Sequence, residues 1–112
     1  MTKPEYRLLA PAKEDLKKIR AYTTNEWGRA QWLEYWSILE ETFTNLALNP
    51  KMGRIRDDIF YPNRRSFLEG RKRRHVIFYF EIEGGIAIYR VLHHSQDIEN
   101  RFRIQEFEEW DL

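Results

Sequence analysis

The chain has 112 residues, no cysteine and a formal net charge of +1 at neutral pH. This length suits one domain with one modest hydrophobic core, which an aromatic fraction of 15% can fill with few side chains. The lack of cysteine excludes disulfides and thiolate metal sites and fits a reducing cytoplasm. No apolar run approaches the roughly 20 residues that cross a bilayer, and no signal-peptide core is present, so we expect a cytoplasmic protein without membrane contact.

The amino-terminal third of the chain predicts a short strand followed by a helix. Residues 5–9 are expected to form the strand, which Pro11 ends. Proline suits the first turn of a helix because its missing N–H would have no partner there. Glu14 and Asp15 are expected in the same turn, where acidic side chains interact favourably with the helix dipole. Gly28 is a natural end for this helix.

A second helix is predicted from Arg29 to Leu48. Asn49 and Pro50 end it, because the residue before proline avoids the helical region. The short break at Gly28 makes the two helices an antiparallel hairpin. Large apolar side chains recur along the second helix at spacings of four, three, four and three, a pattern far more typical of core packing than of a cofactor site. They are Trp32, Trp36, Leu39, Phe43 and Leu46.

The second half of the chain predicts a sheet. Residues 49–63 are expected to be a loop and residues 64–68 a short strand. Residues 75–82 and 86–92 carry large apolar side chains on both faces, which is typical of central strands, and the glycines between them predict a hairpin turn. In the second of these strands, alternation puts Ile86, Ile88 and Leu92 on one face and Ala87, Tyr89 and Val91 on the other.

The order of these elements predicts a single α+β domain over residues 1–112. We expect an amino-terminal strand and an antiparallel helical hairpin packed on an antiparallel sheet of about four strands. Residues 97–112 predict a carboxy-terminal helix, with Ile98, Phe102, Phe107 and Trp110 as its apolar positions.

Charge is strongly segregated along the chain. Residues 1–50 are balanced, residues 51–74 carry nine basic and three acidic side chains, and residues 75–112 carry three basic and eight acidic ones. This asymmetry favours charged partners, although both segments can also be simple solvated faces. The basic residues of the central segment are Lys51, Arg54, Arg56, Arg64, Arg65, Arg71, Lys72, Arg73 and Arg74.

Most signatures of catalysis and of cofactor binding are absent from the sequence. It has no phosphate-cradling glycine motif, no Cys/His spacing for zinc and no nucleophile elbow, so we expect no metal and no cofactor. His75, His93 and His94 stand at the ends of two paired strands and should lie near one end of the sheet. If the strand persists, His93 and His94 point to opposite faces and cannot chelate one metal together. They are surface or hydrogen-bonded residues, or general acids and bases beside Arg90 and the basic run.

The basic run has two kinds of potential partner. Residues 71–74, with Arg64 and Arg65, can contact phosphates, and Phe67, Phe78 and Tyr79 can stack on bases. These aromatic residues alternate as strand core does, however, and the acidic tail opposes a polyanion. An acidic protein partner is equally compatible with the charge.

Short motifs occur in a consistent order from Tyr6 to Asp97. They are Tyr6-x-Leu8, Pro11-Ala12, Asp15-Leu16 and Ile19, Tyr22-Thr23, Trp27-Gly28, Leu46-Ala47-x-Asn49-Pro50, Gly53-Arg54, Arg65-Ser66-Phe67, His75-Val76-Ile77-Phe78-Tyr79, Arg90-Val91-Leu92-His93 and Asp97. Together they resemble the ParE family of type II toxin–antitoxin toxins, within the RelE/ParE superfamily. The chain departs from the family at Gln96, where methionine is usual, and in a longer tail after Asp97.

The resemblance implies a growth-inhibiting toxin that a ParD-like antitoxin neutralises. An acidic, initially disordered antitoxin segment would fold along the helical hairpin and the sheet. The implied target is DNA gyrase, poisoned without a catalytic step, and the implied roles are plasmid maintenance and stress response. Operator DNA would be bound only through the antitoxin. We expect the partner-binding residues to be Arg54, Arg56, Arg64, Arg65, Arg71, Lys72, Arg73, Arg74, Trp32 and Trp36.

Two alternatives remain on the same fold. A RelE-like ribosome-dependent endoribonuclease would use Tyr79 or Tyr89 to stack a base, and its cationic and histidine candidates are Arg56, Arg74, Arg90, His93 and His94. The ParE-like motifs and the lack of a lysine-rich sheet favour the gyrase hypothesis over this one. The third hypothesis is a toxin-derived interaction module that has lost its activity.

Overall fold

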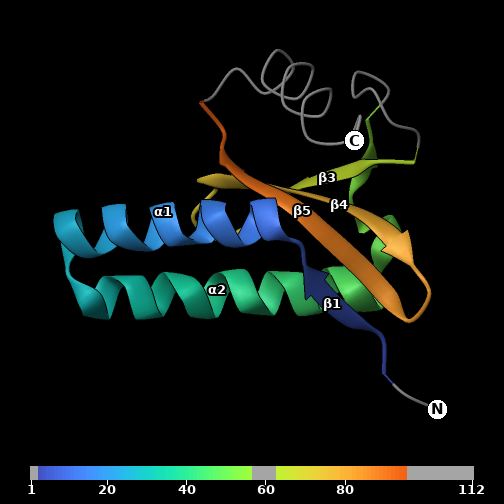
Figure 1. Ribbon diagram of the computed structural model, residues 1–112, viewed down its shortest axis with the longest axis horizontal. Coiled ribbons are helices and arrows are strands. Elements are labelled where there is room, and N and C mark those ends of the chain that lie inside the picture. The colour runs from blue at the N-terminus through green and yellow to red at the C-terminus, as the bar shows by residue number, and fades with distance from the viewer. Residues whose placement is uncertain (1–2, 57–62, 96–112) are drawn as a thin grey trace.

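The computed structural model describes residues 3–56 and 63–95 (Figure 1). The predicted helix over residues 97–112 lies outside these ranges. Within them, neither helix is both long and apolar enough to cross a bilayer. The elements are β1 (Glu5–Leu8), α1 (Ala10–Trp27), α2 (Arg29–Leu48), the 3₁₀ turn η1 (Pro50–Met52), β2 (Arg54–Ile55), β3 (Arg65–Leu68), β4 (His75–Ile82) and β5 (Gly85–His93).

The two helices form the predicted hairpin. Gly28 separates them with φ of 92°, in the region that favours glycine. One expectation about α1 is wrong. The helix begins at Ala10, so Glu14 and Asp15 lie beyond the first turn, which holds no acidic side chain. Pro11 fits here because early helical N–H groups lack intrahelical partners.

The sheet has five strands in the order β1-β5-β4-β3-β2. The α+β class is confirmed, but the expectation of an antiparallel sheet of about four strands needs two corrections. β1 pairs with β5 in parallel, whereas the other pairs are antiparallel. β2 is a two-residue strand inside the segment predicted to be a loop, and two residues are too few to show an alternating pattern.

A register shift in the hairpin of β4 and β5 changes which side chains face the helices. Phe78 pairs with Arg90 but Tyr79 pairs with Ile88, so Tyr89 is an extra residue in β5. As a result Val91 joins the core under the helices and Leu92 faces the other way. The strict alternation predicted for this strand is therefore wrong after Tyr89.

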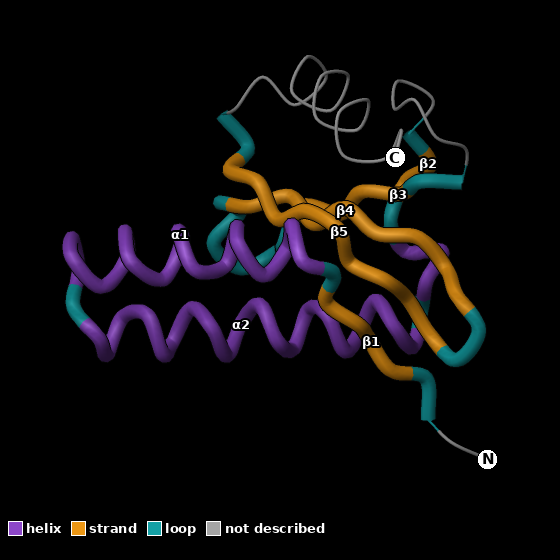
Figure 2. The backbone as a smooth tube through the Cα atoms, viewed as in Figure 1, coloured by secondary structure: helices purple, strands orange, loops and turns teal. Residues whose placement is uncertain are grey.

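Both helices cover one face of the sheet (Figure 2). The main core lies between these layers, and residues such as Leu39 and Phe43 are fully buried in it. Each such side chain contributes ~1.5–3 kcal/mol from the removal of apolar surface from water. A smaller cluster on the opposite face contains Phe78, Tyr89 and Leu92.

Candidate functional site

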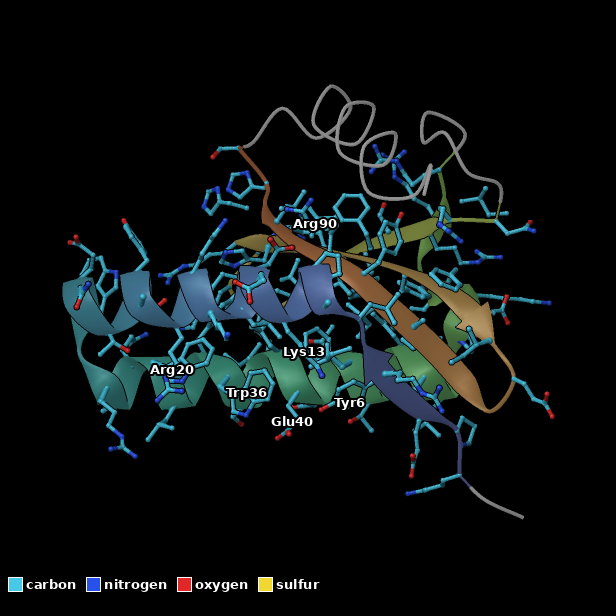
Figure 3. The ribbon with its side chains drawn as sticks, viewed as in Figure 1. Tyr6, Lys13, Arg20, Trp36, Glu40 and Arg90 are labelled. Atoms are coloured by element: carbon cyan, nitrogen blue, oxygen red, sulfur yellow. The ribbon has the colours of Figure 1, made fainter. Side chains whose placement is uncertain are left out.

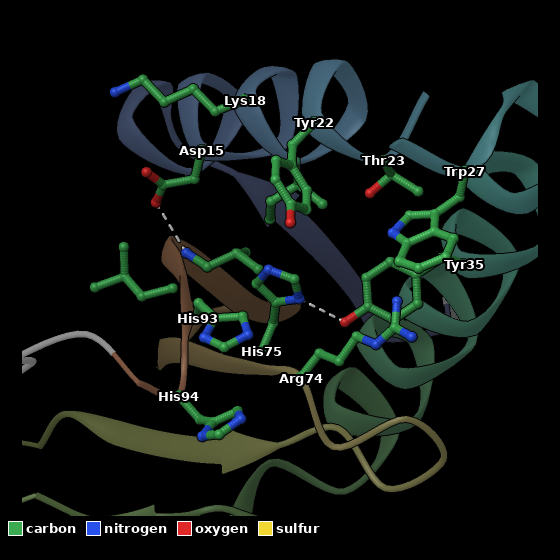
Figure 4. A pocket seen from close by; sticks show the side chains of 13 residues that line it. Asp15, Lys18, Tyr22, Thr23, Trp27, Tyr35, Arg74, His75, His93 and His94 are labelled. Carbon is green, nitrogen blue, oxygen red and sulfur yellow. Dashed lines mark hydrogen bonds between the residues drawn. The ribbon is translucent and has the colours of Figure 1, made fainter. Parts of the chain in front are cut away.

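A cavity of about 640 Å³ opens between α1 and the end of the sheet where β4 begins and β5 ends (Figure 4). We call it the histidine cavity, because His75, His93 and His94 all line it. The prediction that these residues gather at one end of the sheet is confirmed. The volume of the cavity lies within the ~300–1,000 Å³ that is usual for ligand pockets.

His75 is held in its neutral form by its surroundings. Burial lowers its pKa to about 4, and the nearby His93 ring acts in the same direction. Burial also raises the pKa of the Tyr35 hydroxyl. The Tyr35 hydroxyl and Nδ1 of His75 share a hydrogen bond of 2.6 Å, whose direction depends on the tautomer of the neutral imidazole. This contact joins β4 to α2 inside the cavity wall.

The other two imidazoles stack at the cavity rim. The rings of His93 and His94 are stacked with their centroids 4.5 Å apart, and the rings of His93 and His75 are perpendicular with their centroids 5.4 Å apart. β5 ends at His93, so the condition under which His93 and His94 would point to opposite faces does not hold. Burial lowers the pKa of His93, and His94 and Arg74 lower it further. Among the described residues, no group of three or more His, Asp or Glu side chains is placed to hold a metal.

Arg90 is bound to Asp15, which lines the cavity. The guanidinium donates from Nε and Nη2 to the carboxylate oxygens at 2.7 and 2.9 Å, and the backbone N–H of Val91 donates to the same carboxylate at 2.9 Å. Both charged side chains are less than a tenth exposed. The nuclease hypothesis treats Arg90 as a group that contacts RNA, but in this structure it is a buried partner of α1.

The open part of the cavity is aromatic and cationic. Tyr22 and Trp27 are 65% and 64% exposed although both belong to α1. Lys18 and Arg74 also line the cavity. Asp15 is the single carboxylate among the described lining residues, and Arg90 neutralises it. Such a lining suits an apolar group that carries negative charge.

The basic residues do not form one continuous surface. Arg56 is buried, with its Nη1 donating to Ser66 Oγ at 3.2 Å, and Arg65 donates to the Gly53 carbonyl at 2.8 Å. Arg64 lies over the ring of Phe80 at 4.0 Å, while Arg54 is exposed on β2.

The other basic residues lie in residues 70–74, which we call the basic turn. Two of its cations form ion pairs with α2: Arg71 Nη1 lies 3.6 Å from Glu41 Oε2, and Lys72 Nζ lies 3.9 Å from Glu34 Oε1. Arg73 is exposed, and Arg74 lies 6.0 Å from the centre of the Tyr35 ring. Of the predicted partner-binding arginines, all of which the structure describes, only Arg74 lines the histidine cavity.

The two tryptophans predicted to bind the partner belong largely to the core. Trp32 is 9% exposed and stacks on Trp36 with ring centroids 5.9 Å apart, and the Trp36 and Phe43 rings make an edge-to-face contact. Figure 3 shows Trp36 on α2, with Arg90 on the sheet side of α1. The two tyrosines offered as base-stacking residues are also buried. Tyr79 donates from its hydroxyl to the Pro50 carbonyl at 2.6 Å, and Tyr89 is 1% exposed.

Several residues of the site were not predicted from the sequence. The roles of Asp15 and Tyr35 depend on partners far along the chain, so no local pattern indicates them. Tyr22 and Trp27 flank the buried stripe of α1, so the helical pattern by itself does not show that both are exposed.

Comparison with known proteins gives consistent matches over most of the chain. The family described as ParE toxin of type II toxin-antitoxin system, parDE, matches residues 6–98. Toxin ParE1 of Caulobacter vibrioides is 33% identical over 92 residues, which cover 82% of this chain and 91% of that protein. Toxin ParE1 of Mycobacterium tuberculosis is 35% identical over 94 residues, which cover 82% of this chain and 92% of that protein.

A solved structure of the chromosomal ParDE system from P. aeruginosa has the same fold. It superposes with a TM-score of 0.65 at 18% identity, over 80% of this chain and 95% of that one. The fold, the sequence relatives and the family match agree, and the protein belongs to the ParE toxin family of type II toxin–antitoxin systems.

Proposed function

We propose that this protein inhibits growth by binding and poisoning DNA gyrase, and that it does so in the cytoplasm without a catalytic step of its own. Membership of the ParE toxin family supports gyrase as the target. The observation that carries the non-catalytic part of the proposal is that the candidate catalytic side chains are engaged in structural contacts. Arg90 is buried against Asp15, and His75 is neutral and bonded to Tyr35. Groups held in this way stabilise a fold and its surface, whereas a general base needs a pKa near the working pH.

We also propose that a ParD-like antitoxin neutralises the toxin by covering the histidine cavity and the basic turn. The exposed rings of Tyr22 and Trp27 offer apolar contact area, and Lys18 and Arg74 offer positive charge beside it. An acidic amphipathic segment that folds on binding matches both features. Operator DNA is then contacted by the antitoxin rather than by this chain.

A gyrase supercoiling assay tests the proposed target. Purified toxin is expected to reduce supercoiling and to leave cleaved DNA, and the antitoxin encoded beside the toxin gene is expected to restore full activity. Complete supercoiling at a large excess of toxin would contradict the proposed target.

The endoribonuclease hypothesis keeps one supporting observation. Arg74, His93 and His94 do lie together around the histidine cavity. The endoribonuclease hypothesis requires that the toxin cleave mRNA in a translating extract and that His94→Ala abolish this cleavage. We expect no cleavage by the wild-type toxin. If expression without antitoxin leaves growth unimpaired, both toxin hypotheses fail and the inactive interaction module remains.

A further inference from the structure

Glu69 is a buried acid at the centre of the most basic part of the chain. Its side chain is fully buried, at 0% exposure, directly before the basic turn. The backbone N–H groups of Arg71 and Lys72 donate to its Oε2 at 3.0 and 3.1 Å, and that of Arg74 donates to Oε1 at 3.0 Å. Hydrogen bonds to an ionised acceptor are stronger than neutral ones, and they repay part of the cost of burying the charge.

The basic turn has a conformation that it would not readily adopt without such an anchor. Arg73 has φ of 56°, a left-handed conformation that residues other than glycine adopt rarely. Neighbouring cations also repel one another, which favours an open chain. The Glu69 carboxylate opposes both effects, because it gathers the backbone N–H groups on one side of the turn and leaves the cationic side chains on the other.

Arg74 is fixed most firmly by this arrangement. Its N–H donates to Glu69, and its carbonyl accepts from the N–H of His94 at 3.0 Å. Next to it, the N–H of Glu69 donates to the carbonyl of His75 at 3.1 Å. The backbone of Arg74 is thus held from two sides at the point where its side chain enters the histidine cavity.

We propose that Glu69 is the positioning residue of a docking site for acidic protein segments, in which its carboxylate holds the basic turn so that Arg74 presents a guanidinium to the histidine cavity. This inference rests on the proposed binding of an acidic antitoxin. A cation whose backbone is already ordered loses less conformational freedom on binding a carboxylate, and the complex is correspondingly tighter. The pairs of Arg71 with Glu41 and of Lys72 with Glu34 are exposed, so an acidic segment can displace them.

The substitution Glu69→Gln separates positioning from simple charge. It removes a negative charge, so an effect of net charge alone would tighten the binding of an acidic partner. If Glu69 acts by positioning, the same substitution should weaken binding. The amide of glutamine cannot accept hydrogen bonds from all three N–H groups, so the turn would loosen. We expect affinity for the purified antitoxin, measured by calorimetry, to fall at least about tenfold. Glu81→Gln is the matched control, since Glu81 is exposed on β4, and it is expected to change affinity less than about twofold.

Two further measurements use the intact turn, so the test does not depend on Glu69→Gln folding. The amides of Arg71, Lys72 and Arg74 should exchange slowly with solvent in the wild-type toxin. Arg74→Gln should lower affinity at least about tenfold, whereas Arg7→Gln on the edge strand β1 should have little effect.

Three results would overturn the inference: Glu69→Gln binding as tightly as wild type, fast exchange at these amides, or equal effects of Arg74→Gln and Arg7→Gln. A wild-type toxin that does not bind the antitoxin at all would instead refute the proposed function. Slow amide exchange would then still show that Glu69 anchors the turn.

Discussion

Single buried polar residues join elements that are far apart in sequence. Asp15 and Arg90 connect α1 to β5, and Tyr35 and His75 connect α2 to β4. Buried charges carry a large desolvation penalty, so each partner depends on the other for its stability in the folded protein. Neighbouring exposed residues make similar contacts with much less consequence.

Asp15 and Glu14 give a matched pair for testing this difference. Asp15→Asn is expected to lower the free energy of unfolding by ~3–5 kcal/mol, because it leaves Arg90 buried without its counter-charge. Glu14→Gln should change it by less than ~0.5 kcal/mol, because the Glu14–Lys17 pair is largely exposed. Urea denaturation measures both, and equal effects would contradict the structural role of Asp15.

His75 gives the protein a stability that depends on pH. Its pKa is about 4 in the folded state and 6.5 without the fold, so between these values the unfolded chain binds the additional proton. The contribution of neutral His75 to the free energy of unfolding is therefore fully present above pH ~6.5, and up to ~3 kcal/mol of it is lost as the pH approaches 4. Urea midpoints from pH 4 to 8 should show this slope, which His75→Gln should flatten. The exposed His94→Gln variant should keep it; a slope unchanged in His75→Gln would refute the assignment.

The parallel pairing of β1 with β5 is the contact that completes the sheet. It begins where Glu5 lies opposite Gly85, and the N–H of Leu9 donates to the Ile88 carbonyl at 2.9 Å at its other end. A Cβ on Gly85 would overlap the backbone oxygen of Glu5, and φ of 151° there is itself unfavourable for other residues. Gly84, with φ of 84°, faces open space.

Gly85→Ala should therefore be more harmful than Gly84→Ala in the same turn. For Gly84→Ala we expect a loss of ~1–2 kcal/mol, from backbone strain alone. Gly85→Ala should lower the free energy of unfolding by more than this. It should also speed amide exchange at Leu9, because β1 has to move away from β5. Similar losses for both variants, with Leu9 still protected, would argue against the close approach of the two strands.

The charge of the whole molecule is segregated but partly compensated internally. The formal net charge is only +1, and α2 already supplies acids to two cations of the basic turn. The positive charge at the histidine cavity is consequently local, and it matters to a partner that also fits the exposed aromatic residues. Attraction of this kind weakens with salt, since the screening length is ~8 Å at physiological ionic strength.

Antitoxin binding should stabilise the toxin by mass action. At a free concentration about a hundredfold above Kd, a partner that binds only the folded toxin adds ~2.7 kcal/mol to the free energy of unfolding. We expect thermal denaturation of the toxin to shift upward accordingly, and the shift to shrink as salt rises from about 0.05 to 0.5 M. A shift that is independent of salt would indicate apolar contacts alone.

The local elements and the family can be recognised from the amino-acid sequence without the structure. Periodicity and glycine or proline positions set both helices, the hairpin of β4 and β5 and the gathering of His75 with His93, because these depend on neighbours in the chain. The parallel direction of β1, the extra residue at Tyr89 and the partner of Asp15 depend on contacts between distant parts of the chain. The burial of Glu69 also depends on such contacts, because a local pattern specifies which face a side chain takes but not which distant group meets it there.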